Sequence, residues 1–190
     1  MPASFLLRRA LRSGGVGGAV LIYLAMVGML EKFAPLDLVG TALPLSRLLV
    51  LSAPAVAGYV AVRPRIHAGE VQRPTAGPAM AAGAAAGAAA GAVAVAWMVL
   101  VRTIGVDALR GIFVSVTEGA LGVLAFGLGP AAGAAVLVPA AAAAGAVGAA
   151  VRHVPGPVAR PLGLALASTL LFALLQRIVP TVLFELGLDP

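Results

Sequence analysis

The sequence contains no cysteine, a single lysine, two histidines and few charged residues of any kind. The lack of cysteine excludes disulfides, thiolate metal sites and cysteine nucleophiles. His67 and His153 have no second histidine or carboxylate at ligand spacing, so a metal site is not expected. The chain also has no phosphate-binding loop of the Walker type, no Gly-x-Ser-x-Gly turn and no serine, histidine and aspartate set. We therefore expect no metal, no cofactor and no enzymatic activity.

Apolar residues are what the chain has in excess. They make up 61% of its 190 residues, against 11% charged residues, which lies outside the composition of ordinary globular proteins. About 20 apolar residues in a helix span a hydrocarbon core of roughly 30 Å. Five stretches approach that length, at residues 14–30, 43–62, 78–101, 130–151 and 162–179. The sequence predicts an all-α, polytopic transmembrane helix bundle of about five spans, with residues 1–190 forming a single domain.

The first stretch has two interpretations. Arg8, Arg9 and Arg12, followed by the apolar run, resemble the basic and apolar regions of a cleaved signal peptide. However, the run is about 17 residues long, which exceeds a usual signal core, and no small-x-small cleavage site follows it. We therefore favour a retained first helix.

The arginines follow a pattern relative to the five stretches. If all five cross the membrane, one side receives the N-terminal arm, residues 63–75 and residues 152–160, with eight arginines against one glutamate. The other side carries five basic and six acidic residues, so the two sides have net charges of +7 and −1. Basic residues mark the cytoplasmic side, so the N-terminus is predicted to be cytoplasmic and the C-terminus external. The excess positive charge then reflects orientation and contact with anionic head groups, and no nucleic-acid partner is expected.

Residues 108–128 do not fit a simple loop. They read ALRGIFVSVTEGALGVLAFGL, apolar but interrupted by Arg110, Ser115, Thr117 and Glu118. One interpretation is an amphipathic helix at the external interface followed by a short buried segment, with Glu118 paired to Arg110. A second is a re-entrant half-helix packed against protein, and a third is a sixth span. A sixth span would spoil the arginine pattern, and of the other two interpretations we favour the first.

Gly83, Gly87 and Gly91 recur at every fourth residue of the third stretch and share one helix face, with alanine at most positions between them. Small residues at this spacing let two helix backbones approach closely. Alternatively the matches reflect composition, since the chain contains 24 glycines and abundant alanine. Three glycines in register favour a helix-packing face.

Arg47 and Glu118 are the ionisable residues placed nearest to membrane depth. Charges inside a span are costly and often mark a transport pathway. Arg47, however, lies about one turn inside the second stretch, from which its long side chain can reach the interface. We favour interface anchoring for both residues over a transport or gating role.

Two segments show a further similarity. Residues 110–129 read RGIFVSVTEGALGVLAFGLG, and residues 23–40 read YLAMVGMLEKFAPLDLVG. The first resembles a segment of permease subunits of branched-chain amino-acid-type ABC transporters, and the second resembles an N-terminal membrane extension of those permeases. In that family a permease core follows, with a cytoplasmic coupling loop that docks on the ATPase subunit. No such loop precedes residue 190, so the resemblance implies an extension standing alone or a truncated reading frame.

The resemblance implies a membrane component of an ABC-type importer, as a permease part or an accessory membrane domain. Its partners would be the lipid bilayer, an ATPase subunit, a second permease and a solute-binding protein. The alternative is a free-standing membrane scaffold that oligomerises through its glycine-rich faces and transports nothing. Nearly all basic residues are arginine, and with abundant alanine and glycine this usage is typical of a GC-rich bacterial genome. The expected location is therefore the bacterial cytoplasmic membrane.

Overall fold

The computed structural model describes residues 3–35, 44–67, 70–72, 74–110, 116–155, 157–158 and 168. The chain divides into two compact units, Met1–His153 and Val154–Pro190. The helices and strands described below all belong to the first unit. The predicted fifth span at residues 162–179 lies outside the described residues, apart from Ser168.

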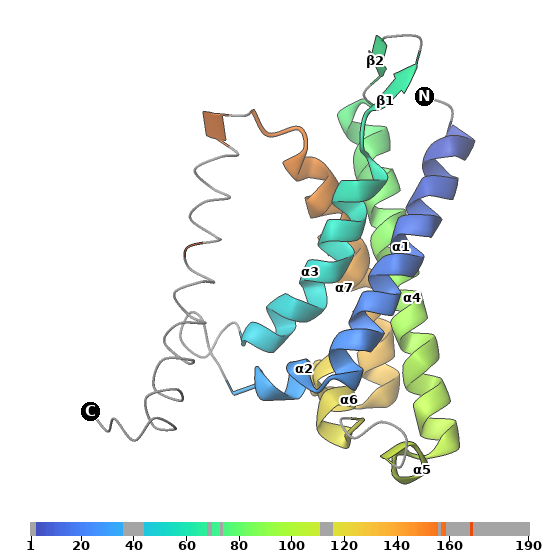
Figure 1. Cartoon of the computed structure of the whole chain (residues 1–190), viewed down its shortest axis with the longest axis vertical. Helices are drawn as coiled ribbons and strands as arrows, with labels where there is room; N and C mark the ends of the chain where they lie inside the picture. The colour runs from blue at the N-terminus through green and yellow to red at the C-terminus, as the bar shows by residue number, and fades with distance from the viewer. Residues whose placement is uncertain are drawn as a thin grey trace. The chain divides into compact units, whose positions relative to one another are not determined.

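The first unit consists of helices and one short hairpin (Figure 1). The prediction of an all-α fold is confirmed at the level of the class. In chain order the elements are α1 (Ala3–Met26), α2 (Met29–Lys32), α3 (Leu45–Ala61), β1 (Arg65–His67), β2 (Glu70–Gln72), α4 (Ala76–Ile104), α5 (Val106–Arg110), α6 (Glu118–Leu124) and α7 (Pro130–Val151).

Four long helices form a bundle in which successive helices α1, α3, α4 and α7 alternate in direction (Figure 1). Helix α4 packs against α1 and α7, and α3 packs against the same two helices and against α4. The alternation brings the start of α1, the end of α3, the start of α4 and the end of α7 to one end of the bundle. We call this the arginine end, because the arginines of the N-terminal arm and the residues that follow α3 and α7 lie there.

The core changes in character along the bundle. Near the arginine end it is built of small side chains, with a cluster made of Leu6, Ala10, Ala57, Ala61, Val62, Ala79, Ala82, Ala86 and Ala149. Toward the opposite end larger side chains fill it, among them Leu21, Leu30, Val50, Met98, Val101, Leu121, Leu124 and Leu137. Small side chains let backbones approach closely, as Gly83 and Gly145 do near the arginine end, and larger side chains fill more of the core toward the other end.

Helices α2 and α6 close the end opposite the arginines. Leu30 of α2 and Leu121 and Leu124 of α6 are fully buried in the same cluster. The Thr117 hydroxyl caps α6 by accepting a hydrogen bond from the Ala120 amide at 3.0 Å. The same hydroxyl donates to the Glu31 carboxylate at 2.5 Å, and this bond joins residues far apart in the sequence.

The structure divides residues 108–128 into the end of α5, a connection and α6, with residues 111–115 outside the description. Thr117 has an extended backbone and is the N-cap of α6, so α6 begins at Glu118 as a separate helix from α5. Helix α5 has five residues and α6 has seven, so neither is long enough to cross a membrane. The buried face of α6 fits both the short buried segment of the first interpretation and the protein-packed half-helix of the second.

An antiparallel hairpin occupies part of the loop between α3 and α4, and sequence reasoning did not anticipate it. β1 and β2 pair with Ile66 opposite Val71 and with His67 opposite Glu70. Pro64 and Pro74 flank the pair, and proline in both positions opposes extension of either neighbouring helix. β-branched residues at the centre of the pair favour extended backbone.

Two helices, α4 and α7, are long and apolar enough to cross a membrane, as judged by length and composition. Helix α3 is apolar but shorter, with 17 residues. Helix α1 has 24 residues, but three arginines lie in its first half. The described helices therefore supply two candidate spans, and they do not support the predicted number of about five.

Candidate functional site

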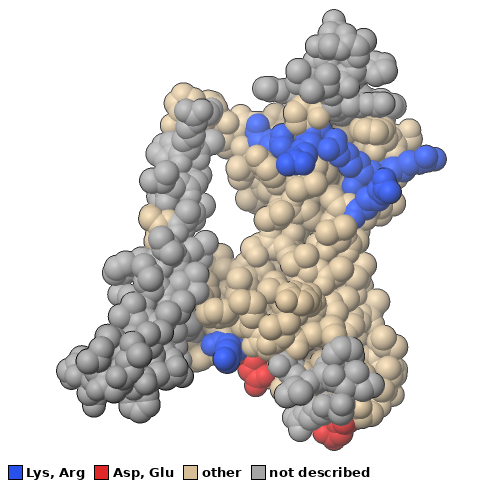
Figure 2. All heavy atoms as spheres, viewed as in Figure 1, with Lys and Arg blue, Asp and Glu red and all other residues tan. Residues whose placement is uncertain are grey.

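The arginine end gathers basic side chains from distant parts of the sequence, as the blue surface in Figure 2 shows. Arg9 of α1 donates from Nη1 to the main-chain oxygen of Arg63, which follows α3, at 2.7 Å. Arg152, which follows α7, donates from Nε to the main-chain oxygen of Tyr59 at 3.1 Å. These bonds use carbonyl groups near the C-terminal end of α3, where cations are favoured.

Two further contacts hold this end together. The Arg152 guanidinium lies 4.3 Å from the centroid of the Tyr59 ring, a cation–π distance. The ring nitrogens of His153 lie 3.3 Å from the main-chain oxygen of Ala149 and 3.2 Å from that of Pro74. His153 thus connects the end of α7 to the residues that precede α4, which is a structural role.

Electrostatic repulsion concentrates at Arg9. Burial lowers its pKa, and the positive charges of Arg63 and Arg152 lower it further. The guanidinium nevertheless stays charged at neutral pH. Within the described part of the chain, none of Arg9, Arg12, Arg63 and Arg152 forms a salt bridge with a carboxylate. The arginine end is therefore suited to hold an anion, and the described side chains there supply none.

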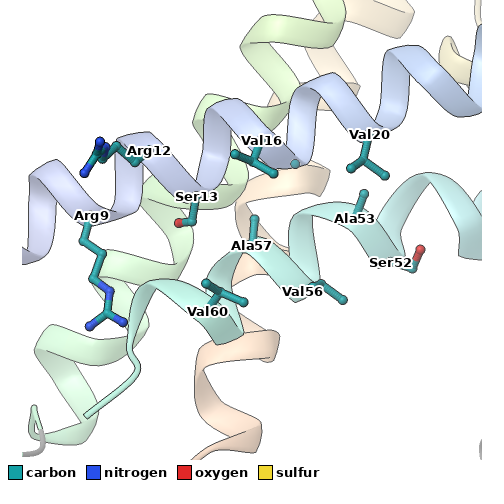
Figure 3. A pocket seen from close by; sticks show the side chains of 11 residues that line it. Arg9, Arg12, Ser13, Val16, Val20, Ser52, Ala53, Val56, Ala57 and Val60 are labelled. Carbon is teal, nitrogen blue, oxygen red and sulfur yellow. The ribbon is translucent and has the colours of Figure 1, made fainter. Parts of the chain in front are cut away.

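An apolar groove runs between α1 and α3 from this end (Figure 3). Arg9, Arg12 and Ser13 lie at its mouth, and Val20 and Ser52 lie at its far end. Its volume is about 420 Å³, within the ~300–1,000 Å³ range of ligand sites. Ser13 and Ser52 donate their hydroxyl groups to carbonyl groups of their own helices, at 3.1 and 2.8 Å. The polar character of the groove therefore comes from the two arginines.

Sequence reasoning missed this groove. Val16 and Val20 are four residues apart on α1, and Val56 and Val60 are four residues apart on α3. This spacing places each pair on one helix face. Paired valine faces beside small residues were the signal that could have indicated it, but no pattern in the sequence says which two helices meet.

The two charged residues predicted near membrane depth both lie at the end opposite the arginines, and both are exposed. Glu118 forms an ion pair with Arg102, with Nη2 and Oε2 3.6 Å apart, rather than the expected pair with Arg110, whose side chain lies outside the description. The two side chains are 40% and 67% exposed, so the pair contributes at most about 1 kcal/mol. Arg47 lines a separate pocket next to α6. Neither placement forms a charged pathway through the bundle.

Gly83, Gly87 and Gly91 are all buried on the face of α4 that meets α7. A Cβ added to Gly83 would lie 2.5 Å from the main-chain oxygen of Gly145 and 2.5 Å from Cβ of Ala149. One added to Gly87 would overlap the main-chain oxygen of Ala141, and one added to Gly91 would lie 3.1 Å from the Val138 Cα. The glycine face thus packs on the α7 backbone within the same chain.

The cap of α6 offers a test of what fixes α6 at the end opposite the arginines. Replacing Thr117 by alanine removes both the cap and the bond to Glu31, so we expect the free energy of unfolding to fall by about 1 kcal/mol. Thr103→Ala is the matched control, because the Thr103 hydroxyl donates to the Leu100 carbonyl of its own helix and caps nothing. Melting temperatures in detergent measure both variants. Equal losses would show that the cap does not fix α6.

The described residues contain no group of three histidine, cysteine, aspartate or glutamate side chains that could hold a metal ion. The chemistry available at the arginine end is the binding of anions beside an apolar groove. No protein-family model, curated protein or solved structure matches this chain.

Proposed function

We propose that the chain is a multi-pass protein of the bacterial cytoplasmic membrane with its arginine end in the cytoplasm. The five spans are then α1, α3, α4, α7 and residues 162–179. The apolar lengths of α4 and α7 support this arrangement. So does the distribution of charge: Arg9, Arg63 and Arg152 gather at one end, whereas the other end mixes acidic and basic residues, among them the Arg102–Glu118 pair. In α1 the arginines stay at the interface while the apolar part beyond them crosses.

Within that membrane the chain acts as a component of an ABC-type importer. The resemblance of residues 23–40 and 110–129 to permease segments supports this assignment, and described residues of the two segments contact each other. Glu31 accepts the hydrogen bond from Thr117, and Leu30 shares a buried cluster with Leu121. Segments that are 86 residues apart at this contact thus build one structural unit. The partners are an ATPase subunit, a second permease and a solute-binding protein, and branched-chain amino acids are the solute class that the resemblance names.

The part that the chain plays in such an importer is accessory. Docking on an ATPase subunit requires a cytoplasmic coupling segment, and the loop between α3 and α4 is the longest one on the arginine side. Its described residues form the β1–β2 hairpin, not a helix. Arg47 and Glu118 act as interface anchors in this account, because both are exposed at the opposite end.

The second candidate is a free-standing membrane protein without transport activity. The observation that favours it is the internal use of the glycine faces: those of α4 and α7 pack on each other, and Gly148 packs on α3. A bundle that satisfies its own packing faces is a self-contained unit. In this candidate the glycine faces of α4 and α7 are used within the chain, so self-association would take place through other surfaces.

Purification from the native host and reconstitution test the assignment together. The chain alone in liposomes should move no solute in response to ATP. A tagged chain extracted in a mild detergent should bring down permease or ATPase subunits, whereas an equally abundant, unrelated membrane protein carrying the same tag should not. ATP-driven uptake by the chain mixed with an ATPase subunit only would refute the accessory role. Recovery of the chain by itself would favour the second candidate.

A further inference from the structure

The groove between α1 and α3 has a small-residue floor and branched apolar walls. A Cβ added to Gly17 would lie 3.0 Å from Cβ of Ala57, so the two helices meet closely there. Val16 and Val56 rise on either side of this contact and remain 66% and 60% exposed. With small residues on its floor and branched side chains on its walls, the groove is narrow and apolar and suits a slender apolar chain.

The dimensions of the groove match one leaflet of a bilayer. Its lining on α1 extends from Arg9 to Val20, and eleven residues of helix rise by about 16 Å. Half of a hydrocarbon core of roughly 30 Å is about 15 Å. The arginines at the mouth therefore lie at head-group level when the far end lies near the bilayer midplane.

Charge distinguishes the mouth from the rest of the groove. Arg9 uses one of its five N–H donors on the Arg63 carbonyl, which leaves donors for a phosphate. Arg12 also lines the groove and is exposed, with its side chain directed away from Arg9 across α1 (Figure 3), and Arg63 and Arg152 add positive potential. An anionic head group at this position would relieve the repulsion among these side chains.

We propose that this groove binds an anionic phospholipid of the cytoplasmic leaflet, with one acyl chain between α1 and α3 and the phosphate on Arg9 and Arg12. The proposal rests on the membrane location given under the proposed function. The ligand is a lipid rather than a soluble phosphate, because the apolar part of the groove beyond the arginines can contact only a ligand that carries an apolar chain.

Native mass spectrometry of the detergent-purified chain measures lipid binding directly. The probes are dioleoyl phosphatidylglycerol, dioleoyl phosphatidylcholine with the same chains, and glycerol 3-phosphate without chains. The wild-type chain should bind the phosphatidylglycerol in preference to both others. Equal binding of the two lipids would overturn the charge assignment, and glycerol 3-phosphate binding as strong as that of the phosphatidylglycerol would overturn the use of the groove.

Variants separate the two parts of the site. The double variant Arg9→Gln, Arg12→Gln should weaken phosphatidylglycerol binding by about tenfold or more. Arg47→Gln, at the other end, should not. Val56→Trp should fill the groove and abolish phosphatidylglycerol binding. Val147→Trp, at a 62% exposed position on α7, should leave that binding unchanged. If the paired variants bind lipid alike, the site is refuted while the membrane location stands; a chain found in the soluble cell fraction refutes both.

Discussion

Replacing Gly87 by leucine is expected to cause a large loss of stability. A Cβ at this position already overlaps the main-chain oxygen of Ala141, and Cα of Ala142 is 3.1 Å away. A backbone cannot rotate away as a side chain can, so α4 and α7 must separate along the whole contact. Overpacked cores lose about 1–3 kcal/mol for small additions, and leucine adds four carbon atoms here, so we expect a loss above that range.

Two pairs of variants within α4 make the comparison strict. Ala81→Leu adds a large side chain at an exposed position and should change the melting temperature in detergent little. Gly87→Ala should destabilise by about 1–3 kcal/mol. Gly77→Ala should be neutral or slightly stabilising, because its Cβ meets nothing within 4 Å and alanine favours helix. If Gly87→Leu melts like Ala81→Leu, and Gly87→Ala melts like Gly77→Ala, the glycine face does not form the contact that holds α4 to α7.

The long helices were predictable because their apolar composition agrees with the residues that mark their ends. The stretch predicted at residues 130–151 coincides with α7, where Pro130 suits the first helical turn. Helix α1 begins at Ala3, well before the predicted start at residue 14. The prediction counted only apolar residues, whereas Leu6 and Ala10 extend the buried face through the arginine-bearing part.

The segment after α4 was predictable only in outline. Its apolar residues indicated burial, and Leu121 and Leu124 are indeed buried. Its break into α5 and α6 depends on Thr117, which contacts Glu31 from a distant part of the chain. A contact between residues so far apart in the chain cannot be recognised from the local sequence. For the same reason Glu118 meets Arg102 rather than the nearer Arg110 that sequence proximity suggested.

The glycine face illustrates the same limit for the candidate site. The spacing of Gly83, Gly87 and Gly91 indicated that one side of the helix could meet another backbone closely. It could not name the partner, because α7 and α1 also carry glycines at similar intervals. The structure places Gly145 of α7 against this face. It also creates the α1–α3 groove, which only the arrangement of the helices defines.

The side of the membrane on which each end lies is the central claim, and single-cysteine labelling tests it most directly. Because the chain has no cysteine, each variant carries one thiol. Ala68→Cys lies in the sequence between β1 and β2, which are on the arginine side, and Ala108→Cys lies in α5 at the opposite end. In intact cells an impermeant maleimide should label Ala108→Cys but not Ala68→Cys, and both should react after permeabilisation. Labelling of Ala68→Cys alone, or of both sites equally, in intact cells would contradict the account.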